Sequence, residues 1–323
     1  MDETRPSKDG PPGPGWLPAR VRRDGAGLVL DWAYVGARRL TEPFYADSLA
    51  AARGDGAGPL VSTPLADLAR WSDRQPSLEP TGLIFHMSRC GSTLASQMLA
   101  ASRANIVVSE AGPIDAAVRL EGDDRDRVQL LRAMVAALGQ VRNPGETRYF
   151  LKLDSWHACA LPLFRAAFPR TPWAFLYRDP AAVMVSHARR TGMQMVGDLV
   201  LPGFYGLRPG GQTWAEDYWA QVLGAICAAV LREYTAGGGL LANYDELPDA
   251  LWARLLPHFG VTPTPDDVEA MAAAATFDAK APGARFTPDT AAKQGEVTPL
   301  IEAAVQRHLA GIHAQLEALR RSF

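Results

Sequence analysis

Leu83-Ile-Phe-His-Met-Ser-Arg-Cys-Gly-Ser-Thr-Leu94 is the stretch that decides the fold. The run Leu83–Met87 is short and apolar, as in a buried strand, and a helical pattern follows from Thr93 to Ala101. Between them, Gly91 lets the backbone come close to a ligand. The first amides of a helix lack intrahelical acceptors, and the helix dipole favours an anion there. The stretch therefore predicts a strand, a turn and a helix that bind an anion with help from Arg89, Ser92 and Thr93.

Short apolar runs alternate with helical patterns through the rest of the chain. The further strand candidates are Ile106–Val108, Tyr149–Leu153, Trp173–Tyr177 and Leu240–Tyr244. Strands that alternate with helices form βαβ units, with a parallel sheet and helices on both faces. We therefore expect an α/β fold. Such sheets bind ligands beyond the carboxyl ends of their strands, so the residues that follow each strand are the candidates for a site.

A second motif follows the strand candidate that ends at Tyr177. Arg178 leaves this strand, Pro180 suits the first turn of a helix, and Ser186 lies two helical turns after Asp179. A guanidinium supplies paired donors, so Arg178 and Ser186 are suited to share one phosphate. An arginine and an aspartate at a helix start also form salt bridges and caps, and this alternative stays open.

The two motifs together resemble those of sulfotransferases that use 3′-phosphoadenosine 5′-phosphosulfate (PAPS), most closely the bacterial and tyrosyl-protein-type members. The resemblance lies in Arg89-Cys-Gly-Ser-Thr93, in Arg178-Asp-Pro-Ala-Ala-Val-Met-Val-Ser186 and in Asn243-Tyr-Asp-Glu-Leu247. It covers about residues 82–260 and implies a P-loop-containing sulfotransferase-like fold. Cys90 stands where the family usually has serine; both are small.

The resemblance implies a role for each matched residue. Arg89, Cys90, Gly91, Ser92 and Thr93 would hold the 5′-phosphosulfate, and Arg178 and Ser186 would hold the 3′-phosphate. The reaction would be in-line transfer of a sulfuryl group to a hydroxyl or amine of a small-molecule or peptide acceptor. The product would be 3′,5′-ADP, and no metal is expected.

Four further residues are candidates through the resemblance. Glu110 follows the run Ile106–Val108 and is the first candidate for the general base, with Lys152 and His157 as further catalytic candidates after the next strand. Lys293 lies in a region where the family has a basic loop over the donor. Each has a plain alternative: a surface or capping carboxylate for Glu110, a structural histidine for His157 and a solvated lysine for Lys293.

Two other functions remain open at this point. A P-loop kinase or nucleotide hydrolase that uses Mg-ATP would need a lysine after Gly91, where the chain has Ser92. Two features favour the kinase or hydrolase: Tyr149–Asp154 loosely resembles a Walker B strand, and the Thr93 hydroxyl would suit Mg²⁺. A non-catalytic relative that binds a nucleotide or a protein partner is the other alternative.

Charge and composition limit the class of protein. The 323 residues include 33 basic and 35 acidic side chains, for a net charge of −2, which argues against bulk nucleic-acid binding. The 3 cysteines lack the spacing of a disulfide framework or a zinc site, so the reducing cytosol is the simplest compartment and we expect a cytoplasmic protein. The N-terminus has no apolar signal region, and no run of about 18 apolar residues predicts a membrane span.

We expect three parts along the chain. Residues 1–15 look like a disordered tail, residues 16–80 an N-terminal appendage, and residues 81–323 the α/β domain. In the appendage, Asp24–Gly27 predicts a hairpin turn, and Ser62 the start of a capped helix. The glycine-rich segment Thr191–Gln212 is a candidate lid on the acceptor side. A homodimer is left open.

Overall fold

A five-stranded parallel sheet forms the centre of the molecule, in the order β5-β6-β4-β7-β8. The computed structural model describes residues 12–25, 27–56, 58–196, 202–207, 214–279, 284–285 and 293–322. The strands are β4 (Gly82–His86), β5 (Asn105–Ser109), β6 (Arg148–Lys152), β7 (Trp173–Tyr177) and β8 (Gly239–Asn243). Residues of β4, β5 and β7 are buried throughout, as expected where helices cover both faces of a parallel sheet. The expected α/β class is confirmed.

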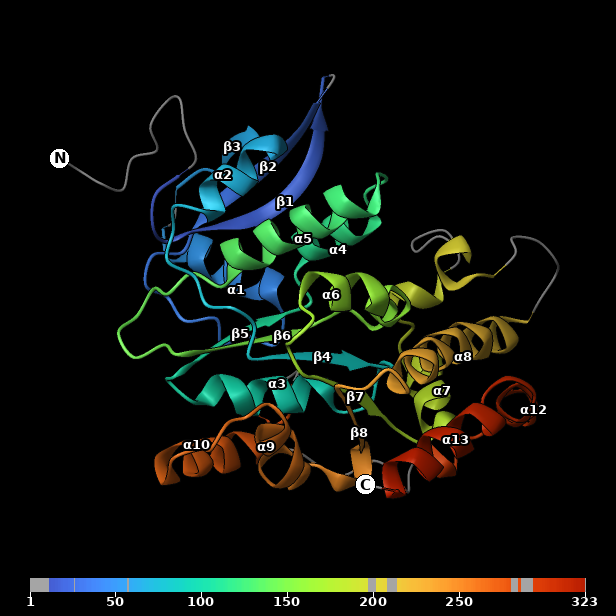
Figure 1. The fold of residues 1–323 in the computed structure, drawn as a ribbon. Coiled ribbons are helices and arrows are strands. Elements are labelled where there is room, and N and C mark those ends of the chain that lie inside the picture. Colours follow the sequence, from blue (N-terminus) through green and yellow to red (C-terminus); the bar gives the residue numbers. More distant parts are fainter. Residues whose placement is uncertain are drawn as a thin grey trace.

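Helices cover both faces of this sheet. Figure 1 shows α3 on one face and α5 and α6 on the other. The helices along this part of the chain are α3 (Ser92–Ala101), α4 (Gly112–Arg119), α5 (Asp124–Leu138), α6 (Leu161–Ala167), α7 (Pro180–Arg189) and α8 (Ala215–Tyr234). The C-terminal helices are α9 (Leu256–His258), α10 (Pro265–Ala275), α12 (Pro299–His308) and α13 (Ala310–Arg321). Among the helices that the structure describes, none combines the length and apolar character of a membrane span.

Shorter helical turns complete the described part. They are the 3₁₀ turns Leu65–Asp67, Ser155–Ala160, Met193–Met195, Pro202–Tyr205 and Tyr244–Glu246, and the π-helical turn Leu251–Leu255. The α-helix after β6 begins at Leu161 with Pro162 in its first turn. A proline inside a helix would lose a hydrogen bond and clash with the preceding turn, so an α-helix could not run unbroken from Ser155 through Pro162.

The N-terminal segment forms an antiparallel sheet of its own, in the order β1-β2-β3. Its elements are β1 (Trp16–Asp24), β2 (Gly27–Tyr34), α1 (Tyr45–Gly54), β3 (Val61–Pro64) and α2 (Leu68–Ser72). The predicted hairpin is confirmed. The helix predicted to start at Ser62 is wrong, because Ser62 and Thr63 pair with β2 and Thr63 accepts a hydrogen bond of 2.9 Å from the Trp32 indole. Tertiary pairing here overrides the local helix signal.

This segment packs against the α/β part of the chain. The amide of Gly15 donates to the Gln140 side chain at 3.1 Å, and that side chain donates to the carbonyl of Trp16 at 2.7 Å. Helix α2 packs on α5. Of the predicted tail, residues 1–11 lie outside the described residues, whereas Pro12 and Gly15 are buried. The three-part division along the chain stays a prediction.

Strand β4 is the point at which the chain changes direction in the sheet. Strands β5 and β6 lie on one side of β4, and β7 and β8 lie on the other. A crevice opens at such a switch point, beyond the carboxyl ends of the strands, and ligands bind there in open α/β sheets. The loops that follow β4, β5, β7 and β8 all reach this edge, so the fold gathers residues that are far apart in the sequence.

Candidate functional site

The loop between β4 and α3 has a strained backbone. Ser88, Arg89 and Gly91 have φ angles of 80°, 51° and 81°. A non-glycine residue in this region costs about 1–2 kcal/mol, and such residues concentrate at ligand sites. Contacts from outside hold the loop: Gln194 donates to Ser88 Oγ at 2.8 Å, and Arg89 donates to the carbonyl of Arg190 at 2.7 Å.

Gly91 allows close contact between this loop and the segment after β8. A Cβ atom at position 91 would lie 2.8 Å from side-chain atoms of both Leu247 and Tyr244. Only glycine combines that approach with the positive φ. Helix α3 begins at Ser92, and its N-cap residue, Gly91, has no side chain that could cap it. A helix N-terminus without such a cap favours an anion, and the binding of one here stays a prediction.

The loop opens into a pocket of about 230 Å³ at the carboxyl edge of the sheet. Its lining comes from the β4–α3 loop, the ends of β7 and β8, helix α7 and two C-terminal segments. The lining residues are Arg89, Cys90, Gly91, Ser92, Thr93, Leu94, Arg178, Ser186, Tyr244, Asp278, Ala279 and Lys293. Every residue predicted to bind the donor lies on this lining, although the roles assigned to them stay predictions.

Arg178 follows β7 and lines the same pocket. Its side chain is 3% exposed, and the guanidinium carbon lies 3.9 Å from the centroid of the Tyr244 ring. A cation over an aromatic face is attracted by the ring's negative face, so Tyr244 orients the guanidinium. Asp179 caps α7 by accepting from the amide of Ala182 at 2.8 Å, and this helix carries Ser186 to the pocket. Arg89 after β4 and Arg178 after β7 therefore both contribute positive charge to the pocket lining.

The pocket also contains residues that sequence reasoning did not single out. Tyr244 stands directly after β8, and the strand-end rule applied to that strand would have found it. Asp278 and Ala279 follow α10 and belong to no recognisable motif. Lys293 is 5% exposed and therefore not a solvated lysine. Residues 286–292 lie outside the described residues, as do 197–201 and 208–212 of the segment Thr191–Gln212, so the lid stays a prediction.

Glu110 belongs to a cluster at the same sheet edge, which we call the Glu110 cluster: Glu110, Lys152 and His86. These residues stand at the ends of the adjacent strands β5, β6 and β4. Lys152 is fully buried and pairs with Glu110 Oε1, and His86 Nε2 lies 3.4 Å from the same oxygen. Glu110 has a φ of 53°, and its side chain remains 23% exposed. The structure thus brings together two of the predicted catalytic residues.

Electrostatics keep Glu110 ionised. Burial alone would raise the pKa of Glu110, but the charge of Lys152 and the contact with His86 outweigh it and hold that pKa well below its usual range. Lys152 also lies 5.1 Å from the centroid of the Phe44 ring, which comes from the N-terminal segment. Burial lowers the pKa of Arg89, the charge of Arg190 lowers it further, and the charge of Glu110 opposes both. Glu110 is therefore close enough to the pocket to interact with its arginine.

His86 connects the Glu110 cluster to the β4–α3 loop, and sequence reasoning missed it. The amide of Ser88 donates to His86 Nδ1 at 3.0 Å, so the ring proton resides on Nε2, which donates to the carbonyl of Leu153 at 2.9 Å. Burial lowers the pKa of His86 and favours this neutral form. In the sequence, His86 lies within the apolar run Leu83–Met87, so no local pattern marks it as a candidate site residue.

His157 belongs to a separate group, the Asp115 cluster: Asp115, Asp154 and His157. His157 is 1% exposed, and its Nε2 lies 3.1 Å from Asp115 Oδ1, which also accepts from the Trp156 indole at 2.6 Å. Within the described ranges, these three residues have ligand atoms within 4.8 Å of one another. Hydrogen bonding accounts for the shortest of these contacts. The absence of a metal and the catalytic role of His157 both stay predictions.

Comparison with known proteins gives matches among solved structures only. No family model and no curated protein matches the chain. The chain is similar to the sulfotransferase domain from the curacin biosynthetic pathway, at 15% identity over 72% of this chain and 98% of the other, with a TM-score of 0.45. It is similar to a sulfotransferase from Mycobacterium avium at 13% identity over 74% and 79%, with a TM-score of 0.46.

A third structure of the same kind is a sulfotransferase from Mycobacterium tuberculosis H37Rv. The identity is 15% over 75% of this chain and 81% of the other, with a TM-score of 0.44. The likeness to all three structures is distant.

Proposed function

We propose that the chain is a sulfotransferase that moves a sulfuryl group from PAPS to a hydroxyl or amine. The observation that carries the proposal is the pocket, in which Arg89 with the N-terminus of α3 faces Arg178, Ser186 and Lys293. Two separate anionic groups of one small ligand suit such a pocket. PAPS has this form, with a phosphosulfate at one end of the ribose and a phosphate at the other.

Positioning and charge stabilisation would supply most of the catalysis. Arg89 and the amides of α3 would hold the 5′-phosphosulfate and stabilise negative charge on the leaving phosphate oxygen. Arg178 and Ser186 would bind the 3′-phosphate. Cys90 lies beneath the loop, where its thiol donates to the carbonyl of Leu176 at 3.1 Å, and so acts through the loop's shape.

Glu110 is the proposed general base. It would take the proton of the acceptor while the acceptor's oxygen or nitrogen forms the new bond to sulfur. The bond from sulfur to the bridging phosphate oxygen breaks, and 3′,5′-ADP leaves. A carboxylate with so low a pKa is a weak base. Proton transfer would therefore require the contact between Glu110 and Lys152 to weaken when the acceptor binds, which would raise the basicity of Glu110.

A Mg-ATP enzyme is less consistent with the same residues. The position of the Walker lysine carries Ser92, and the carboxyl of Asp154, the acid of the Walker B-like strand, is largely buried beside His157, 3.9 Å away. Titration calorimetry separates the functions. The proposal expects 3′,5′-ADP to bind without Mg²⁺. Binding of ATP only, and only with Mg²⁺, would contradict it, and binding of 3′,5′-ADP without sulfation of any acceptor would leave a non-catalytic relative.

The substitution Arg178→Ala tests the assignment within the pocket. Hydrogen bonds to a charged group are worth about 1.5–3 kcal/mol, so the affinity for 3′,5′-ADP should fall roughly 10- to 100-fold. The affinity for 5′-AMP should stay the same, because that ligand lacks the 3′-phosphate. Arg125→Ala, on the exposed face of α5, is the matched control. If the preference for the 3′-phosphate persists in Arg178→Ala, Arg178 does not bind it.

A further inference from the structure

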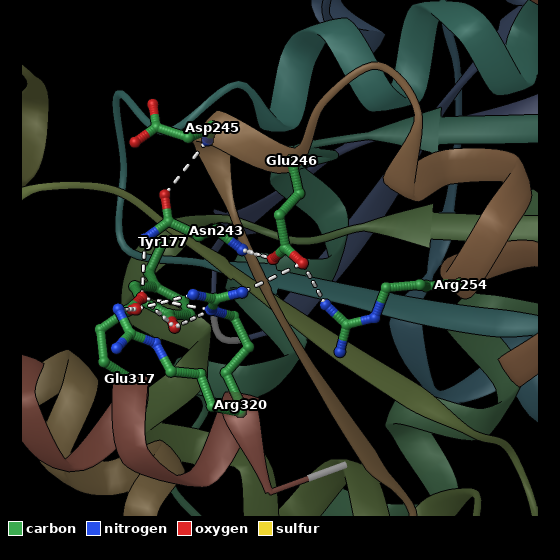
Figure 2. Close-up of polar contacts among 8 residues, drawn as sticks. Tyr177, Asn243, Asp245, Glu246, Arg254, Glu317 and Arg320 are labelled. Carbon is green, nitrogen blue, oxygen red and sulfur yellow. Dashed lines mark hydrogen bonds and ion pairs between the residues drawn. The ribbon is translucent and has the colours of Figure 1, made fainter.

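A network of charged and polar side chains joins the C-terminal helix α13 to the ends of β7 and β8 (Figure 2). Glu317, on α13, accepts from the Tyr177 hydroxyl at 2.7 Å and from the Asn243 side-chain amide at 2.8 Å. Arg320, one turn later, pairs with Glu317 at 2.7 Å. One carboxylate from the far end of the chain thus holds the last residue of each of two strands.

A second carboxylate completes the network. Glu246 accepts from the amide of Asn243 at 2.8 Å and pairs with Arg254 at 2.6 Å and with Arg320 at 3.1 Å. Arg320 therefore bridges Glu246 and Glu317. Hydrogen bonds from Arg320, Tyr177 and Asn243 lower the pKa of Glu317 to about 2, so Glu317 is ionised at any pH near neutrality.

The network ends one residue before the pocket on both strands. Tyr177 and Asn243 are paired across β7 and β8. The residues that follow them, Arg178 and Tyr244, line the pocket and contact each other, with the guanidinium carbon 3.9 Å from the ring centroid. Restraining Tyr177 and Asn243 restrains the direction in which both pocket side chains leave the sheet.

The polar contacts add to a small apolar contact between helix α13 and the core. Leu316 is the only fully buried side chain of α13 within the described residues, and Ile312 and Leu319 are partly buried against the core. Apolar burial of this kind is non-directional. A satisfied polar network specifies geometry more sharply than apolar packing does. The network is therefore suited both to attach α13 and to fix the orientation of the ends of β7 and β8.

We propose that Glu317 is a positioning residue that sets the Arg178–Tyr244 pair for an anionic group, and so gives the pocket its preference for a nucleotide with a 3′-phosphate. This inference rests on the proposed function. Glu317 does not line the pocket and acts through Tyr177 and Asn243. The C-terminal helix, outside every motif of the sequence, thereby contributes to donor selection.

The test compares Glu317→Ala with Asp217→Ala. Asp217 is similarly buried, 18% exposed against 15%, and holds α12 to α8 through Arg307 and His308, away from the pocket. Binding of 3′,5′-ADP and of 5′-AMP is measured by calorimetry, beside the unfolding temperature. Because Glu317 acts on the pocket only through its neighbours, Glu317→Ala should weaken the binding of 3′,5′-ADP roughly tenfold and leave the affinity for 5′-AMP unchanged. Asp217→Ala should change neither affinity.

Two gentler variants keep the test decisive if Glu317→Ala does not fold. Glu317→Gln retains an acceptor for Tyr177 and Asn243 and should recover most of the affinity, whereas Tyr177→Phe removes one donor and should lose part of it for 3′,5′-ADP alone. Equal losses for both ligands, or a loss in Asp217→Ala as large as in Glu317→Ala, would overturn the inference. If the wild-type protein binds no 3′,5′-ADP, the proposed function fails first and the inference falls with it.

Discussion

The Glu110 cluster and the Asp115 cluster each place a carboxylate beside a buried histidine, and they differ in the third member. The Glu110 cluster has Lys152 as its third member, whereas the Asp115 cluster has a second carboxylate, Asp154. In the Glu110 cluster, Lys152 holds the pKa of Glu110 well below its usual range. In the Asp115 cluster, burial raises the pKa of Asp154 to about 7, and the charge of His157 only partly opposes it.

The difference shows that the partner, and not the residue type, decides which carboxylate is ionised. Glu110 pairs with the ammonium group of Lys152, whereas Asp154 lies 3.9 Å from the imidazole of His157, which is closer to Asp115. Exposure differs as well: the Glu110 side chain is 23% exposed and the His157 side chain 1% exposed. An acceptor can reach Glu110 without unfolding its surroundings. Glu110 therefore remains the proposed base, and variants of both clusters can break or sharpen the comparison.

Glu110→Gln should have the largest effect. Loss of a general base typically lowers kcat by about 10²–10⁴-fold, while affinity for 3′,5′-ADP should stay within about twofold because Glu110 does not line the pocket. Sulfation rates and calorimetry measure the two quantities. Glu302→Gln, an exposed carboxylate on α12, is the control and should change neither. An unchanged rate in Glu110→Gln would remove the base role from this residue.

His157→Asn should affect stability and spare the rate. The substitution removes the contact with Asp115 and leaves this partly buried carboxylate one donor short, at a cost of about 1–3 kcal/mol in free energy of unfolding. The sulfation rate should stay within about twofold at a temperature where the variant is folded. A fall in rate as large as that of Glu110→Gln would reverse the comparison and move the base to His157.

Asp154→Asn should have the smallest effect, and only at high pH. In the folded protein burial raises the pKa of Asp154 to about 7, against about 3.9 in an unfolded chain. The folded state therefore binds the extra proton between these values, and the contribution of Asp154 to stability falls as pH rises from about 4 to about 7. Asparagine does not titrate, so the variant should match the wild type near pH 4 and should unfold at a higher temperature than the wild type at pH 8. The same difference at both pH values would show that Asp154 does not titrate as described.

Much of the site was predictable because its signals are local. Arg89, Gly91 and Ser92 lie within one strand–turn–helix unit, and Arg178 and Ser186 within another, so short-range patterns identified them. Tyr244 follows β8 and so lies within reach of the strand-end rule, but its contact with Arg178 depends on β8 lying beside β7. His86 required its partners, Ser88 and Glu110, to be visible. The α-helix after β6 begins only at Leu161, because Pro162 is tolerated in a first helical turn and not in a helix interior. At Ser62, pairing with β2 overrides the local helix signal.

The sequence by itself determined the α/β class, the two anion-binding motifs and the candidate base, because strand and helix periods and glycine positions act over a few residues. Only the tertiary structure decided that these motifs share one pocket, that Phe44 of the N-terminal segment covers Lys152, and that Glu317 holds the strand ends beside Arg178. Strand order and burial fix these contacts, and both depend on residues far apart in the chain. Ionisation follows the same rule, since Glu110 and Asp154 differ through their neighbours in space.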